Sequence, residues 1–230
     1  MRHYDFHAAA RVDHFIANSK ETQKRILKFY RREAAVIYPP IDINPKSKIL
    51  NPKQIQSTKF QKNKQYYLVV SRLAQPKNVD LAIQAANERK FPLKIAGVGP
   101  DEKRLKALAG PTVEFLGFVP DSDLPRLYEC AKAFLALSGD EDFGMTPVEA
   151  QMYGTPVIAY RGGGYQESIE EGKTGIYVEA LTAQELGRAI GKFETQHFSR
   201  ESCISYATKF SKVRFKREIA AFVKNHGVVS

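Results

Sequence analysis

Short apolar runs alternate with longer amphipathic stretches over much of the chain. Six runs predict strands: YYLVVS from Tyr66, PLKIAG from Pro92, TVEFLG from Thr112, AFLALS from Ala133, PVIAY from Pro156 and GIYVE from Gly175. Four stretches between them, 78–89, 101–109, 122–132 and 146–153, have the length and spacing of helices. Strands that are apolar on both faces and alternate with helices indicate a parallel sheet covered on both sides, which is a doubly wound α/β fold.

Shorter elements flank this region. Within residues 1–40 we expect a helix through 8–11, a strand in VDHFIANS, a helix capped at Ser19 and a strand in AAVIYPP, which together are too small for an independent domain. Near the other end, 183–192 and 212–225 have helical spacing. The second of these carries an apolar stripe at i, i+4, i+7 and i+8, formed by Phe215, Ile219, Phe222 and Val223. Such a stripe needs a covering surface, so we expect self-association or a further domain.

Composition narrows the class of protein. The 230 residues are 43% hydrophobic, with 14 Phe and 11 Tyr, which suffices for a large core. No apolar run approaches the roughly eighteen residues of a membrane span, and the start, MRHYDFHAAARVD, lacks the apolar core of a secretory signal. Two cysteines, Cys130 and Cys203, form neither a disulfide framework nor a four-ligand zinc site. We therefore expect a cytoplasmic protein.

Positive charge is concentrated in one segment. The net charge is +10, and residues 41–64 hold six lysines but one acidic residue, Asp42. This segment is predicted to be an exposed basic linker. Proteins that bind single-stranded nucleic acid stack bases on aromatic side chains, and Phe60 is the only aromatic residue of the segment, so nucleic acid is not an expected partner.

The loops that follow strands carry the candidate chemistry, because ligands of doubly wound sheets bind beyond the carboxyl ends of the strands. In SGDEDFGMTPVEA, Thr146 is predicted as the helix N-cap, with Pro147 first in the helix and Glu149 completing a capping box. The amides of 143–148 would then face solvent at a positively polarised helix end, where they could bind a phosphate. The alternative is a plain capping box, in which Glu149 only returns a bond to the Thr146 amide.

Two more loops add charge to the same edge of the sheet. In SRLAQPKN, Arg72 and Lys77 suit the two phosphates of a nucleotide sugar, since arginine grips phosphate bidentately and lysine adds a mobile charge. The alternative is two solvated cations beside a helix cap. Glu141 and Glu149 have seven residues between them, and each carboxylate could accept hydrogen bonds from neighbouring sugar hydroxyls. For Glu141, with an aspartate on each side, the alternative is a solvated acidic turn.

Other loops give weaker signals. Gly97, in GVGP, would let the backbone approach a ligand closely, and Val119, in GFV, could present its backbone to a base edge. RGGGYQE could pass close to a transferred sugar. The alternative for Gly97 is ordinary turn chemistry, and for RGGGYQE it is a flexible turn. The DSD triplet precedes a predicted helix and is better explained as N-capping, and the two histidines near the start have no evident third ligand, so we expect no metal and no cofactor.

These segments together resemble the donor-binding half of a family 4 glycosyltransferase, a retaining enzyme built from two facing Rossmann-like domains, the GT-B architecture. The resemblance rests on VSRLAQPKNVDLAIQA, LKIAGVGPDEKRL, VEFLGFVPDSDLPRLY and EDFGMTPVEAQMYGTPVIAYRGGGYQESIEEGKTGIYV. It implies a donor-binding domain over residues 65–195. It also implies a remnant of an acceptor domain over 1–40, the linker over 41–64, and C-terminal helices over 196–230.

The resemblance also implies a role for each site residue. Arg72 and Lys77 would hold the donor diphosphate and neutralise its developing charge, and Glu141 would bind the transferred sugar. Glu149 would bind the ribose, and the base would meet the backbone of Val119. The substrate-binding positions are then Gly97, Val119, Phe143, Gly144, Met145, Thr146 and Glu149.

The implied activity is transfer of a hexose, with mannose expected, from a nucleoside diphosphate to a glycan or lipid-linked acceptor at the inner face of a membrane. Only about forty residues precede the linker, where the family has a whole acceptor domain. We therefore expect the donor half of an enzyme, which acts with a separate N-terminal domain or by self-association. Two alternatives stay open: a nucleotide-sugar-binding fragment without turnover, and a basic interaction protein that uses the sheet as a scaffold.

Overall fold

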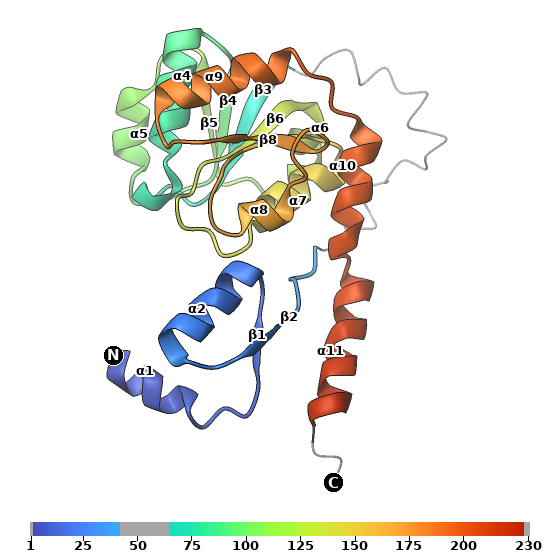
Figure 1. The fold of residues 1–230 in the computed structure, drawn as a ribbon. Helices are drawn as coiled ribbons and strands as arrows, with labels where there is room; N and C mark the ends of the chain where they lie inside the picture. Colours follow the sequence, from blue (N-terminus) through green and yellow to red (C-terminus); the bar gives the residue numbers. More distant parts are fainter. Residues whose placement is uncertain (1, 42–64, 228–230) are drawn as a thin grey trace.

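The computed structural model describes residues 2–41 and 65–227, in two parts (Figure 1). The sheet domain runs from Tyr66 to Glu194, and the N-terminal piece comprises residues 2–41. The last helix leaves the sheet domain and runs beside the N-terminal piece (Figure 1). Within the described ranges no helix is long and apolar enough to cross a membrane.

Six parallel strands form the sheet, in the spatial order β5-β4-β3-β6-β7-β8. Their bounds are β3 (Tyr66–Val70), β4 (Leu93–Ala96), β5 (Val113–Gly117), β6 (Ala131–Ala136), β7 (Val157–Tyr160) and β8 (Gly175–Val178). Each strand overlaps one of the six predicted runs, and every neighbouring pair is parallel. The α/β prediction is therefore confirmed, and the strand order is that of a Rossmann-type sheet.

Helices cover both faces of the sheet. Buried side chains of α4 (Val79–Arg89) and α9 (Ala183–Glu194) pack on one face, together with α5 (Glu102–Leu108). The other face is covered by α6 (Leu124–Cys130), α7 (Met145–Met152) and α8 (Tyr165–Ser168). The predicted helix 122–132 is two residues too long at each end, because Ala131 pairs with Tyr66 and starts β6.

The chain changes direction at the centre of the sheet. From β3 it moves outward through β4 to β5, then returns to β6 and moves the opposite way through β7 to β8. The loops that leave β3 and β6 therefore start side by side, at the carboxyl ends of adjacent strands. In doubly wound sheets this switch point is where ligands bind.

The N-terminal piece contains α1 (Arg2–Ala9), β1 (Phe15–Ala17), α2 (Lys20–Tyr30) and β2 (Ala34–Val36), and its two strands pair in parallel. The cap at Ser19 is confirmed, since its hydroxyl accepts a bond of 2.9 Å from the Thr22 amide. The helix predicted at 8–11 overlaps the end of α1, but its bounds are wrong, because α1 starts at Arg2 and ends at Ala9.

Two other predictions change at the ends of the sheet domain. Ile41 is not part of a solvated linker, because it is 2% exposed and its amide donates to the carbonyl of Phe210. The rest of that linker, 42–64, lies outside the described residues. The helix α10 (Arg200–Ala207), capped by Ser199, lies within the C-terminal helices expected over 196–230, although its bounds were not predicted.

The final helix, α11 (Lys212–His226), confirms the predicted element and contains no fully buried residue. Its apolar stripe is partly covered, since the Phe222 ring lies 6.1 Å from that of His14 in the N-terminal piece. Farther up the helix, the Arg214 guanidinium donates to the carbonyl of Tyr38 at 2.7 Å. The N-terminal piece thus supplies part of the surface that the stripe requires.

Candidate functional site

The loops after β3 and β6 meet through a charged pair. The Lys77 ammonium lies 2.8 Å from a carboxylate oxygen of Glu141. One residue on, the Asn78 side-chain amide donates to the carbonyl of Leu137, also at 2.8 Å. The structure therefore joins two of the three residues predicted as catalytic, and neither Lys77 nor Glu141 is the solvated charge of the alternative interpretation.

Tyr165, on α8, also contacts Glu141. Its ring is 4% exposed, and its hydroxyl donates to the same Glu141 oxygen at 3.4 Å. Burial, and then the Glu141 charge, raise the pKa of Tyr165 well above its ordinary value, so the phenol stays protonated and remains a donor. Sequence reasoning missed Tyr165, although it lies in the RGGGYQE segment that was singled out.

Arg72 lies at the start of the loop after β3 and is exposed. Among the described residues, none forms a hydrogen bond or ion pair with its guanidinium. Five residues later the same loop carries Lys77 in its 3₁₀ turn, Gln75–Lys77. The loop therefore presents one cation held by Glu141 and a second that has no partner in the described structure.

The N-cap of α7 lies two residues earlier than predicted. Gly144, at φ 88°, is the N-cap and makes no side-chain cap bond, and the helix starts at Met145. The prediction of Thr146 as N-cap is therefore wrong. No carboxylate or carbonyl of the described residues accepts from the amides of Gly144, Met145 or Thr146. They remain the unpaired donors of a helix start, as an anion site requires.

Gly144 is required at this point for two reasons. Its φ of 88° is in the left-handed region, and a Cβ atom there would lie 2.7 Å from the Tyr165 ring. The preceding residue, Phe143, is buried, and its ring packs 5.6 Å from that of Tyr38 and 5.1 Å from that of Phe210. The Phe143 side chain thus belongs to the core, which leaves only its backbone for a ligand.

Glu149 points into the protein and not back to the helix start. Its carboxylate accepts a bond of 3.1 Å from the Tyr128 hydroxyl, so the capping-box alternative is wrong. Burial raises the pKa of Glu149 above its ordinary value; the Tyr128 bond opposes this shift, and the charge of Asp121 adds to it. A partly buried carboxylate with one phenol partner is costly to a fold, and departures of this kind from local stability are typical of functional sites.

Gly97 and Val119 lie apart from this cluster in the described contacts. Gly97, at φ 134°, leaves room for the Ser71 carbonyl, which a Cβ would approach to 1.9 Å. Packing between the loops after β3 and β4 therefore explains this glycine without a ligand. Val119 lines an open cavity with Lys94, Arg126 and other residues, and none of its described lining residues belongs to the loops after β3 and β6.

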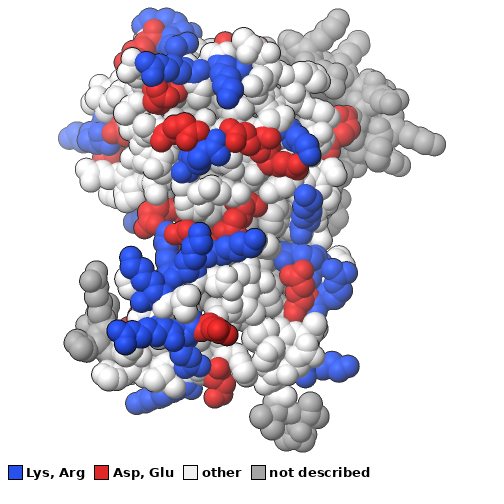
Figure 2. Space-filling view, in the orientation of Figure 1, with Lys and Arg blue, Asp and Glu red and all other residues white. Residues whose placement is uncertain are grey.

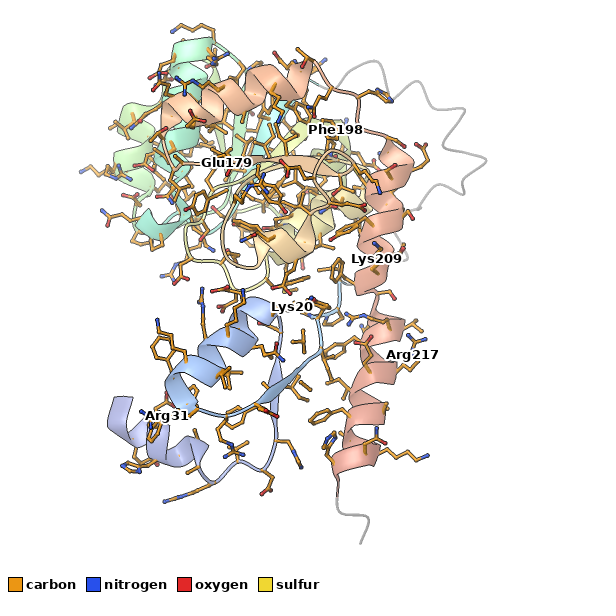
Figure 3. All side chains as sticks on the ribbon, in the orientation of Figure 1. Lys20, Arg31, Glu179, Phe198, Lys209 and Arg217 are labelled. Carbon is orange, nitrogen blue, oxygen red and sulfur yellow. The ribbon has the colours of Figure 1, made fainter. Side chains whose placement is uncertain are left out.

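Glu167, at the end of the RGGGYQE segment, binds the N-terminal piece. Its carboxylate accepts from the amides of Lys20 and Glu21, at 2.8 and 3.1 Å, and from the Tyr38 hydroxyl at 2.9 Å. A carboxylate at a helix N-terminus is favoured by the helix dipole. Lys20 lies at the border of the two parts (Figure 3). The segment is therefore an ordered docking contact, which excludes the interpretation as a flexible turn.

Comparisons of the sequence with protein families and with known proteins give matches to glycosyltransferases. Residues 51–210 match the family described as Glycosyl transferases group 1. An uncharacterized 41.2 kDa protein in the cps region of Klebsiella pneumoniae is 28% identical over 213 residues, which is 89% of this chain and 59% of that protein. Mannosylfructose-phosphate synthase of Agrobacterium fabrum is 32% identical over 138 residues, which is 52% of this chain and 30% of that enzyme.

Solved structures share the fold over almost the whole chain. The crystal structure of Anabaena HepE in complex with UDP-glucose aligns with a TM-score of 0.79 and 25% identity, over 97% of this chain and 67% of that one. The chain spans no more than 59% of the length of the two relatives named above.

Proposed function

Because the chain belongs to the glycosyl transferases group 1 family, we propose that it binds a nucleoside-diphosphate sugar at the switch point of the sheet and takes part in transfer of the hexose. The observation that carries this proposal is the contact between Lys77 and Glu141, which brings a phosphate-binding cation to a sugar-binding carboxylate. Anabaena HepE, with which the chain shares its fold, was crystallised with UDP-glucose.

In this proposal the diphosphate lies between the loop after β3 and the start of α7. Arg72 binds it from one side, Lys77 from the other, and the unpaired amides of Gly144, Met145 and Thr146 add donors that carry partial positive charge. Glu141, freed from Lys77 when the phosphate takes the ammonium, accepts hydrogen bonds from the hydroxyls of the sugar. Tyr165 stays protonated beside Glu141 and holds its carboxylate in place.

The chemistry that these groups favour is cleavage of the bond between the anomeric carbon and the phosphate oxygen. The electron pair of that bond goes to the leaving diphosphate, and positive charge builds on the sugar ring. Arg72 and Lys77 stabilise the diphosphate, and the Glu141 carboxylate stabilises the ring. Cations fixed in position before the reaction stabilise a leaving group better than solvent that has to reorganise.

Glu149 is proposed to bind the nucleoside ribose. Its raised pKa and single phenol partner are consistent with a carboxylate kept for ligand hydroxyls. For the sugar, mannose is the first candidate, and one relative is a mannosylfructose-phosphate synthase. Retention at the anomeric carbon, a metal-independent reaction, a cytoplasmic location and a glycan or lipid-linked acceptor are further parts of the proposal, which rest on the resemblance to family 4.

The N-terminal piece favours a second candidate function, binding without turnover. Its described residues form a sheet of only two strands, and the chain spans 59% or less of the two relatives named above.

Calorimetric titration of the chain with UDP, GDP, UDP-glucose and GDP-mannose tests the proposed function. Binding of at least one nucleotide with its sugar conjugate supports it, and no binding across the panel would refute it. A labelled donor then separates the two candidates. Release or transfer of the labelled sugar indicates an enzyme, whereas saturable binding with no release indicates a binding module.

A further inference from the structure

One arginine of the N-terminal piece binds the loop that carries Glu141. Arg25, on α2, donates to Asp142 at 2.9 Å and forms a shorter contact with Asp140. On its own helix it also donates to Glu21 at 3.3 Å. Figure 2 shows this border as a band of acidic side chains on the sheet domain opposite basic side chains of the N-terminal piece.

The two aspartates are the neighbours of Glu141 in sequence, and they bind a different group. Asp140 and Asp142 turn to Arg25, while Glu141 between them turns to Lys77 and Tyr165. Because Arg25 holds the residue on each side of Glu141, it restricts the backbone between them and with it the direction of the Glu141 carboxylate, which points to where the donor is proposed to bind.

We propose that Arg25 is a positioning residue for the donor sugar. It holds Asp140 and Asp142 and thereby sets the direction of the Glu141 carboxylate. Arginine suits this role because its planar guanidinium can donate to several carboxylates at once, which the single ammonium of lysine does less well. This inference rests on the proposed function, since it assigns Arg25 an effect on the sugar that Glu141 binds.

A purely stabilising role for Arg25 is disfavoured by exposure. The side chains of Asp140 and Asp142 are 78% and 56% exposed, and that of Arg25 is 31% exposed. Ion pairs this open to solvent contribute little to the free energy of unfolding. These ion pairs can instead restrict the conformation of the loop that carries Glu141. Such a restriction would change the affinity for a nucleotide sugar relative to that for the nucleotide alone.

The test compares Arg25→Ala with a matched control on the same helix, Lys24→Ala. Lys24 is exposed, carries the same charge and lines the same surface hollow beside Asp140. Arg25→Lys is the conservative variant. For each protein, calorimetry measures the affinity for UDP and for UDP-glucose, or for the diphosphate and sugar conjugate of the preferred base. The ratio of the two affinities reports the contribution of the sugar.

We expect Arg25→Ala to keep the affinity for the nucleoside diphosphate within about twofold and to lower the ratio about tenfold, the effect of one hydrogen bond to a charged group. Arg25→Lys should restore part of the ratio, and Lys24→Ala should match the wild type. An unchanged ratio in Arg25→Ala, or an equal loss for both ligands, would overturn the inference and leave the proposed function standing. If the wild type bound neither ligand, the proposed function itself would fail.

A second pair of variants covers the case in which Arg25→Ala misfolds. Asp140→Ala with Asp142→Ala removes the same contacts from the exposed side of the border and should lower the ratio equally. Where Arg25→Ala folds, adding it to this pair should have no further effect, because the interaction is already lost. An additive loss would contradict the proposal.

Discussion

Replacing Gly144 with alanine tests whether the start of α7 and Tyr165 act as one unit. The backbone there is left-handed, at φ 88°, which costs a residue with a Cβ about 1–2 kcal/mol. The new Cβ would also lie 2.7 and 2.9 Å from two atoms of the Tyr165 ring. Overpacking of this kind costs about 1–3 kcal/mol, so the free energy of unfolding should fall by about 2–5 kcal/mol in total.

The matched control is Gly172→Ala. Gly172 has φ 78°, but a Cβ there would meet nothing within 4 Å, so the variant pays only the backbone cost of about 1–2 kcal/mol. In a chain of this size 1 kcal/mol shifts the Tm by about 2–4 °C, which predicts a fall of roughly 4–20 °C for Gly144→Ala and roughly 2–8 °C for Gly172→Ala. Differential scanning calorimetry measures both.

Donor affinity also distinguishes Gly144→Ala from Gly172→Ala. In Gly144→Ala the Tyr165 ring has to move, which disturbs its bond to Glu141, and the amides of the helix start move as well. Donor affinity should therefore fall in Gly144→Ala and stay at the wild-type value in Gly172→Ala. Equal Tm values for the two variants, or an unchanged donor affinity in Gly144→Ala, would refute the reasoning.

Three further predictions concern single side chains. Arg72→Ala should weaken nucleoside-diphosphate binding at least tenfold with little change in Tm, because the guanidinium has no described partner to lose; unchanged affinity in calorimetry would exclude Arg72 from the site. Glu149→Gln should lower donor affinity yet raise the Tm near neutral pH. The raised pKa of Glu149 means that the folded wild type loses stability, relative to the variant, as pH rises past 4.5; a lower Tm for the variant at pH 7 would contradict this. Phe222→Ser on α11 should abolish any dimer seen by analytical ultracentrifugation, and a wild type that is monomeric at high concentration would refute self-association.

The fold could be predicted from the sequence because its signal is local. Each strand of the sheet is a short apolar run, and the alternation with amphipathic helices dictates a parallel sheet. Once the sheet is parallel, the loops after Val70 and Ala136 must emerge at the same edge. The proximity of Lys77 and Glu141 follows from this topology and needs no information about side-chain contacts.

The parts of the site that could not be predicted depend on contacts distant in sequence or on backbone conformation. The bonds of Arg25 to Asp140 and Asp142 span more than a hundred residues and depend on how the N-terminal piece docks, to which Glu167 contributes. The start of α7 was misplaced because Gly144 can adopt the left-handed conformation and begin the helix without a side-chain cap. Pro147 is tolerated as the third residue of α7, since the amides of the first turn have no partner within the helix.

The central claim is that a pyrophosphate binds where Arg72, Lys77 and the start of α7 meet. A crystal structure of the chain with UDP-glucose tests it most directly. We predict phosphate oxygens at about 3 Å from the Arg72 guanidinium, the Lys77 ammonium and the amides of Gly144 and Met145, with Glu141 turned to the sugar. A pyrophosphate bound in the cavity lined by Val119, or on the basic surface of α2, with Arg72 and Lys77 making no contact to it, would contradict the claim.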